Sequence, residues 1–195
     1  MCLCEVEGLP QAQTAVTMTE QGKLVVDSAL SWWKEQRSRP VFCWVHLYDP
    51  HEPYLPHFEE FGDRFQERPY DGELAYVDSQ VGRILEHLKN QKLDRNTLIV
   101  VVGDHGESLG EHNERTHGMT LYQSALHVPL IVSLPGLAGG GRRIPQPVSL
   151  VNLFPTLVDC LLGPLRKPVS GRSLKAALSS GSIAPDVCYA ATDDP

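Results

Sequence analysis

The sequence lacks any apolar run of about 18 residues, the length that a membrane-spanning helix requires. Its opening residues, MCLCEVEGLPQAQT, lack the basic start and long apolar core of a secretory signal. Basic residues are also scarce, with 17 Lys and Arg against 24 Asp and Glu and a net charge of -7. Broad nucleic-acid or anionic-membrane surfaces need clustered basic side chains, so we expect neither class of partner. An anionic substrate would need a local positive site, such as a metal.

The chain has 5 cysteines, an odd number at scattered positions. Cys2 and Cys4 lack the second pair of ligands that a zinc knuckle or ribbon needs. We therefore expect unpaired thiols, with Cys43 and Cys160 in the core. The compartment of the protein is left open by these observations.

The pattern of apolar residues predicts an α/β fold with a mainly parallel sheet flanked by helices. Residues 1–18 show no periodicity and are expected to form an irregular arm, with one domain over 19–195. The expected helices cover residues 19–37, 70–90, 151–163 and 171–178. The expected strands cover residues 41–48, 96–103, 128–134 and 186–191. The first of them is apolar on both faces, as is typical of a central strand covered by helices.

The clearest helix is the one over 70–90, where apolar residues recur every three or four positions and Asp71 stands where a cap is needed. The expected core face carries Leu74, Val77, Val81, Ile84 and Leu88. Gly163 is expected to close the helix over 151–163.

Polar residues follow two of the expected strands, at the sheet edge where ligands bind in open α/β folds. One strand runs into Asp49 and His51, and another into Asp104 and His105. Adjacent residues of a regular strand point to opposite faces, so Asp104 and His105 can reach one ion if the flanking glycines permit a turn. A carboxylate with an imidazole suits Zn, Mn or Fe better than Ca. The alternative is an Asp that caps the turn beside a solvated His.

His117 lies where the chain can return to the same pocket, and His51 stands between prolines that stiffen its backbone. Either imidazole can bind an anion when protonated or pass a proton to a leaving group. Taken singly, each also fits an ordinary surface or core-edge histidine. Glu107 and Glu111 are expected to be exposed loop carboxylates, with the alternative that they orient a ligand histidine.

The other histidines are assigned no chemical role. His46 is expected to be packed within its strand, and the rest are expected to be structural or solvated: His57, His87, His112 and His127.

Several blocks of the sequence together resemble the second half of the sulfatase family, in the alkaline-phosphatase-like superfamily. They occur in the family's order and spacing over residues 40–178. The blocks are HLYDPHEPY, YDGELAYVDSQVGRILEHL, NTLIVVVGDHGESLGEH, THGMTLYQSALHVPLIV, VNLFPTLVDCLLG and GRSL. The resemblance implies a hydrolase of sulfate esters, or of related phosphate or phosphonate esters, built on an α/β fold around one divalent metal.

The resemblance also assigns roles to individual residues. Asp104 matches the family's metal-binding aspartate, and His105 stands where many sulfatases carry asparagine. This departure leaves Ca, Mn and Zn open as the metal and leaves sulfate and phosphate esters open as substrates. His51 matches the histidine that touches the sulfuryl group and protonates the leaving oxygen. His117 falls where relatives place a lysine or histidine against the same anion.

Two parts of the family pattern have no counterpart in the sequence: the paired acidic metal ligands of the first strand and the nucleophile motif Cys/Ser-x-Pro-x-Arg. Cys43 lacks the following Pro-x-Arg. We therefore expect a catalytic domain truncated on its N-terminal side and incomplete alone. Such a chain exposes a sheet edge and apolar surface, so it is expected to self-associate or to pair with a missing N-terminal segment. The alternatives are a non-catalytic binding remnant and a phosphoryl or phosphoethanolamine transferase.

Overall fold

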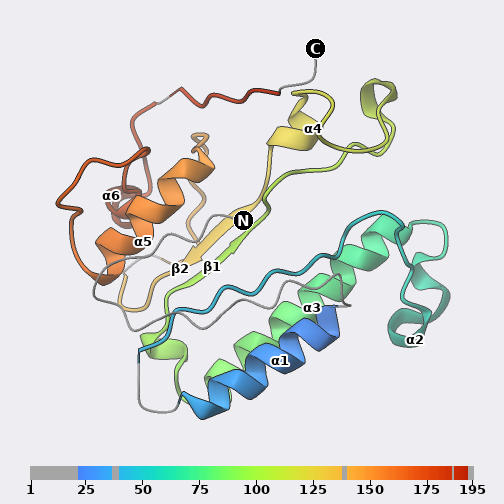
Figure 1. The fold of residues 1–195 in the computed structure, drawn as a ribbon, viewed down its shortest axis with the longest axis horizontal. Coiled ribbons are helices and arrows are strands. Elements are labelled where there is room, and N and C mark those ends of the chain that lie inside the picture. The colour runs from blue at the N-terminus through green and yellow to red at the C-terminus, as the bar shows by residue number, and fades with distance from the viewer. Residues whose placement is uncertain (1–21, 37–39, 138–139, 186, 193–195) are drawn as a thin grey trace. The chain divides into compact units, whose positions relative to one another are not determined.

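The computed structural model describes residues 22–36, 40–137, 140–185 and 187–192 (Figure 1). The expected arm over 1–18, with Cys2 and Cys4, lies outside these residues. The chain divides into two compact units, the first ending at Asp94 and the second starting at Arg95. No helix within the described ranges has the length and apolar character needed to cross a membrane.

The first unit is built on two helices, α1 (Gly22–Glu35) and α3 (Pro69–Asn90), which lie side by side (Figure 1). A short helix, α2 (Phe58–Phe61), and a 3-10 turn over Gly62–Phe65 stand before α3. Val26 of α1 and Leu88 of α3 are buried. Burying such a side chain stabilises the fold by about 1.5–3 kcal/mol.

The predicted helix over 70–90 is confirmed as α3, but its start and its buried face differ from expectation. Pro69 occupies the first turn, where its fixed φ suits a helix and its missing N–H costs nothing. Asp71 makes no cap and instead pairs with Arg68 at 2.8 Å. The expected core residue Leu74 is 46% exposed, whereas Glu73, Tyr76, Gln80 and Leu88 are buried. The helix packs through this polar-and-aromatic face, which turns Leu74 outward.

The expected strand over 41–48 is extended but has no strand partner among the described residues. Its side chains alternate between half-buried and exposed, and Phe42 and Trp44 are 63% and 72% exposed. The expectation of apolar burial on both faces is therefore wrong for the described residues. Self-association of the chain stays a prediction.

The second unit contains a two-stranded sheet of β1 (Ile99–Val102) and β2 (Leu130–Ser133). The strands are antiparallel, with Val102 opposite Leu130 and Ile99 opposite Ser133. The mainly parallel sheet of the sequence prediction is thus wrong for the described residues. Parallel strands are joined by a crossover of a dozen or more residues, usually a helix that packs on the sheet. The connection from β1 to β2 instead carries a short helix, α4 (Gln123–Leu126), and brings the chain back at the same end of the sheet.

The rest of the second unit is helical. A 3-10 turn over Leu150–Asn152 leads into α5 (Leu153–Leu161), and α6 (Lys175–Ser180) follows. Gly163, with φ of 91°, stands just beyond α5, as expected for the glycine that ends a helix. Asp186 lies outside the described residues, and 187–191 form no strand. Cys43 and Cys160 are unpaired and half-buried, and burial raises the pKa of each thiol.

Candidate functional site

Asp104 and His105 lie in the loop that follows β1. Asp104 Oδ1 accepts the backbone N–H of His105 at 3.0 Å, which makes a tight turn. His105 Nδ1 lies 2.9 Å from the carbonyl oxygen of Gly106, so this nitrogen carries the proton and donates it. In the neutral ring the lone pair is then on Nε2, which lies 3.9 Å from Asp104 Oδ1. The turn thus presents a carboxylate oxygen and an imidazole nitrogen side by side.

Gly106 is required by space at this turn. Its N–H donates to the carbonyl of Ala125 at 2.7 Å, so the loop backbone packs directly on α4. A Cβ at position 106 would lie 2.0 Å from the carbonyl oxygen of Ser124. Neither Gly103 nor Gly106 has a positive φ. Glycine is needed at position 106 because two backbones approach each other closely, and a special backbone conformation is not the reason.

His117 stacks on His105, with ring centroids 3.7 Å apart and planes 24° from parallel. Its Nδ1 lies 3.2 and 3.3 Å from the two oxygens of Glu107. The Glu107 side chain is 5% exposed, so the expectation of an exposed loop carboxylate is wrong for this residue. Glu107 instead contacts His117 and orients its ring, and the binding of a ligand by this histidine stays a prediction. Glu111 is exposed, as expected, and backbone N–H groups of Glu111 and Leu109 lower the pKa of its carboxyl.

His51 belongs to the first unit and is described within it. Its Nδ1 donates to the carbonyl of Glu52 at 2.8 Å, and its ring stacks on Tyr48 with centroids 4.4 Å apart. These contacts fix the ring. Its combination with Asp104, His105 and His117 stays a prediction. His46, expected to be packed, is exposed because it lies on the outward face of the extended segment 41–48.

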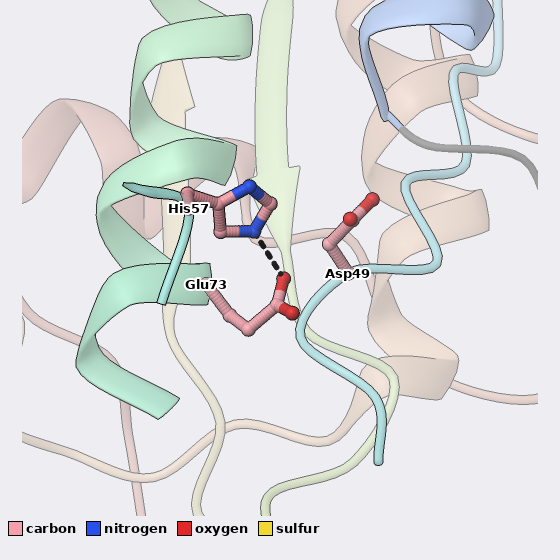
Figure 2. A group of neighbouring side chains, drawn as sticks. All are labelled: Asp49, His57 and Glu73. Carbon is pink, nitrogen blue, oxygen red and sulfur yellow. Dashed lines mark hydrogen bonds and ion pairs between the residues drawn. The ribbon is translucent and has the colours of Figure 1, made fainter. Parts of the chain in front are cut away.

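A second polar cluster, which the residue pattern does not predict, consists of Asp49, His57 and Glu73, and Figure 2 shows Asp49 beside the hydrogen-bonded pair of His57 and Glu73. His57 Nε2 lies 3.0 Å from Glu73 Oε2, and these side chains are 8% and 4% exposed. The His57 ring also stacks on Tyr76 at 3.9 Å, and burial raises the pKa of the Tyr76 hydroxyl. A carboxylate at position 73 between apolar neighbours of α3 was the one available signal, since a buried Glu needs a partner.

The donor set at Asp104 and His105 fits a divalent metal in part. Both side chains are accessible, at 73% and 43% exposed, and offer one oxygen and one nitrogen ligand. They are two ligands of the four or more that a metal takes. Three donors from His, Cys, Asp or Glu lie close together at the other cluster, Asp49, His57 and Glu73, among the described residues.

Comparison with known proteins places the chain in a family. The sulfatase family model matches residues 11–164. Human arylsulfatase K is 34% identical over 105 residues, which are 54% of this chain and 19% of the relative. The chain thus spans about a fifth of the length of the curated relatives that it matches.

Solved structures agree with this assignment. The phosphonate monoester hydrolase SpPMH from Silicibacter pomeroyi is 37% identical, with a TM-score of 0.55 over 61% of this chain and 23% of its own. The putative sulfatase yidJ from Bacteroides fragilis has a TM-score of 0.71 over 82% of this chain and 41% of its own. Its 23% identity makes it evidence for the sulfatase fold alone. The chain belongs to the sulfatase family, in the alkaline-phosphatase-like superfamily.

Proposed function

We propose that the chain supplies the metal-binding and anion-binding part of a sulfatase-type ester hydrolase. The observation that carries the proposal is the arrangement of Asp104, His105 and His117 after β1, within the region that the family model matches. The substrate class is an anionic ester of sulfate, phosphate or phosphonate. The proposal covers part of a site, because relatives of this chain extend well beyond it.

Asp104 and His105 would hold one divalent metal, Ca, Mn or Zn, through a carboxylate oxygen and Nε2. When bound, such an ion polarises an ester oxygen and stabilises charge that develops on the transferred group. The contact between His105 Nδ1 and the Gly106 carbonyl sets the tautomer that presents Nε2. The backbone contact of Gly106 with Ala125 holds this turn in place.

His117, in its protonated form, would contact the oxygens of the bound anion. Glu107 keeps the ring in one orientation, and stacking on His105 keeps it beside the metal ligands. His51 would donate a proton to the leaving oxygen. The bond from His51 Nδ1 to the Glu52 carbonyl places the transferable proton of the imidazolium on Nε2.

A phosphonate or phosphate ester is the second candidate substrate. The match to a phosphonate monoester hydrolase at 37% identity favours it, whereas the matches to arylsulfatase K favour a sulfate ester. At neutral pH a sulfate monoester and a phosphonate monoester each carry one negative charge, whereas a phosphate monoester carries close to two. The central atom, sulfur or phosphorus, is therefore what separates a sulfate ester from a phosphonate ester. Competition between sulfate and phenylphosphonate for the metal-loaded chain separates them.

The first experiment titrates Ca²⁺, Mn²⁺ and Zn²⁺ into the full chain by calorimetry at neutral pH. The variant Asp104→Ala/His105→Ala should lose one binding event. The matched control is Glu111→Ala/His112→Ala, which removes an adjacent carboxylate and imidazole from the same loop and should leave that event unchanged.

Anion binding is measured next, on the chain loaded with whichever metal binds. His117→Gln should weaken binding of sulfate or phenylphosphonate by about tenfold, the effect of losing one charge-assisted contact. Metal binding that is the same in the wild type and in Asp104→Ala/His105→Ala would contradict the proposal. It would favour a non-catalytic remnant of the fold.

A further inference from the structure

We propose that Asp49, His57 and Glu73 form a second divalent-cation site, selective for a transition metal of the zinc class and separate from Asp104 and His105. The proposal goes beyond the function proposed above and does not depend on it. All three residues belong to the first unit, and one ligand atom from each lies within 4.8 Å of the other two (Figure 2).

The donor set is one imidazole nitrogen and two carboxylate oxygens. This mixture suits Zn²⁺, Co²⁺ or Mn²⁺, whereas Ca²⁺ prefers oxygen ligands alone. Ligands about 2.0–2.2 Å from zinc lie about 3.3–3.6 Å apart at a tetrahedral angle. His57 Nε2 and Glu73 Oε2 are 3.0 Å apart, so these two atoms would open by a few tenths of an ångström. The three donors lie within 4.8 Å of one another, so the Asp49 carboxylate would move toward the ion by about 1 Å.

Other contacts already hold each side chain in place. Asp49 Oδ2 accepts the N–H of Gly22 at 3.0 Å, and Glu73 Oε1 accepts the N–H of Leu55 at 2.7 Å. The stack on Tyr76 fixes the plane of the His57 ring. Such outer contacts orient ligands around protein metals, and they reduce the entropy that binding has to remove.

The charge of the cluster also favours a cation. Two carboxylates meet one imidazole, and the His57 and Glu73 side chains are more than nine-tenths buried. Charge in such a place is costly unless it is compensated. A divalent ion would balance both carboxylates with a neutral imidazole. Binding would replace the hydrogen bond between His57 and Glu73. The Nε2 proton of the neutral ring would move to Nδ1, which lies 4.0 Å from Glu60 Oε2, and the lone pair left on Nε2 would face the ion.

The site would join three parts of the first unit. Asp49 contacts the start of α1, Glu73 belongs to α3, and His57 precedes α2. The segment from Asp49 to His57 contains His51. A bound ion would therefore fasten both ends of the segment that carries this histidine to the two main helices.

Cobalt titration tests the proposal, because Co²⁺ replaces zinc and gives visible d–d bands when nitrogen and oxygen ligands surround it. The full chain carrying Asp104→Ala/His105→Ala is the background, so the other metal ligands are removed. In this background one Co²⁺ should bind with visible bands. Asp49→Asn and His57→Gln should each weaken it at least about tenfold, and Glu86→Gln, an exposed position of α3, should not. Absence of a bound Co²⁺, or equal affinity in all variants, would overturn the proposal.

A second measurement in the same background needs no change to the cluster. In the ¹⁵N-histidine NMR spectrum, Zn²⁺ should shift Nε2 of His57, which its contacts with Tyr76 identify. If His57 stays unshifted while Zn²⁺ saturates the chain, the cluster is a hydrogen-bond network alone and the site does not exist.

Discussion

The two polar clusters described above are built from the same types of side chain, carboxylate and imidazole, but one is buried and the other is exposed to solvent. In the first unit, His57 and Glu73 are buried between helices and are 8% and 4% exposed. In the second, Asp104 and His105 lie on a loop and are 73% and 43% exposed. A buried carboxylate–imidazole pair is costly to break, because each partner left alone stays desolvated. An exposed pair costs little to break and can exchange water for a ligand.

The comparison separates stability from chemistry. The closed cluster, which is Asp49, His57 and Glu73, joins α1, the segment 49–57 and α3, so its loss should weaken the fold. The open cluster, which is Asp104, His105 and His117, is positioned by a backbone contact of Gly106 and by the buried Glu107 side chain. Its exposed donors therefore contribute little to packing. Variants in the two clusters should therefore move different measurements.

The largest expected effect is on the closed cluster. Glu73→Ala removes the carboxylate partner of His57 Nε2 and of the N–H of Leu55 and should lower the free energy of unfolding by about 3 kcal/mol. Urea unfolding measures the change. Glu86→Ala on the same helix, at an exposed position, should change it by less than about 0.5 kcal/mol. Equal effects from the two variants would end the distinction between the clusters.

A smaller effect is expected at the backbone contact that supports the open cluster. Gly106→Ala places a methyl group 2.0 Å from the Ser124 carbonyl oxygen, and we expect a loss of about 2 kcal/mol with weakened metal binding at Asp104 and His105. Gly82→Ala is the matched control, because a Cβ there meets no atom within 4 Å. In the interior of α3 it should stabilise the protein by about 1 kcal/mol. Thermal unfolding and metal titration of both variants give the answer, and a harmless Gly106→Ala would contradict the close-approach explanation.

The smallest effect concerns the ion pair between Asp27 of α1 and Arg83 of α3. Hydrogen bonds from Arg83, and then from Lys23, hold the pKa of Asp27 below its ordinary value of 3.8. The folded-state pKa is the lower one, so the pair stabilises the fold above pH 3.8 and this contribution is lost as the pH falls through the folded value. The Asp27 side chain is 39% exposed, so the contribution is about 0.5 kcal/mol after solvent screening.

The variant Asp27→Asn tests this ion pair. The difference in unfolding free energy between the variant and the wild type should be present at pH 7 and should shrink at acid pH. A difference that stays constant from pH 7 to acid, or grows, would exclude the ion pair as its source.

Part of the candidate site could be predicted from residue order alone. Asp104, His105 and His117 stand out because carboxylate and imidazole groups follow an apolar strand, and the structure brings the two histidine rings into contact. Glu107 could not be separated from Glu111 in this way. Both are loop carboxylates in the sequence, and burial against His117, a property of the folded loop, distinguishes Glu107. The cluster of Asp49, His57 and Glu73 was missed because its members are brought together by the packing of α3 against the preceding segment.

The sequence by itself determined the positions of the longer helices, because apolar residues that recur every three to four positions form a helix face wherever the helix packs. It also determined the family, because the order and spacing of the sequence blocks identify it. Tertiary structure alone decided which face of α3 is buried and that β1 and β2 run antiparallel. It also decided which acids lose contact with water. Burial and strand pairing depend on contacts with residues distant in the chain, and the local pattern of residues does not specify which distant residues make those contacts.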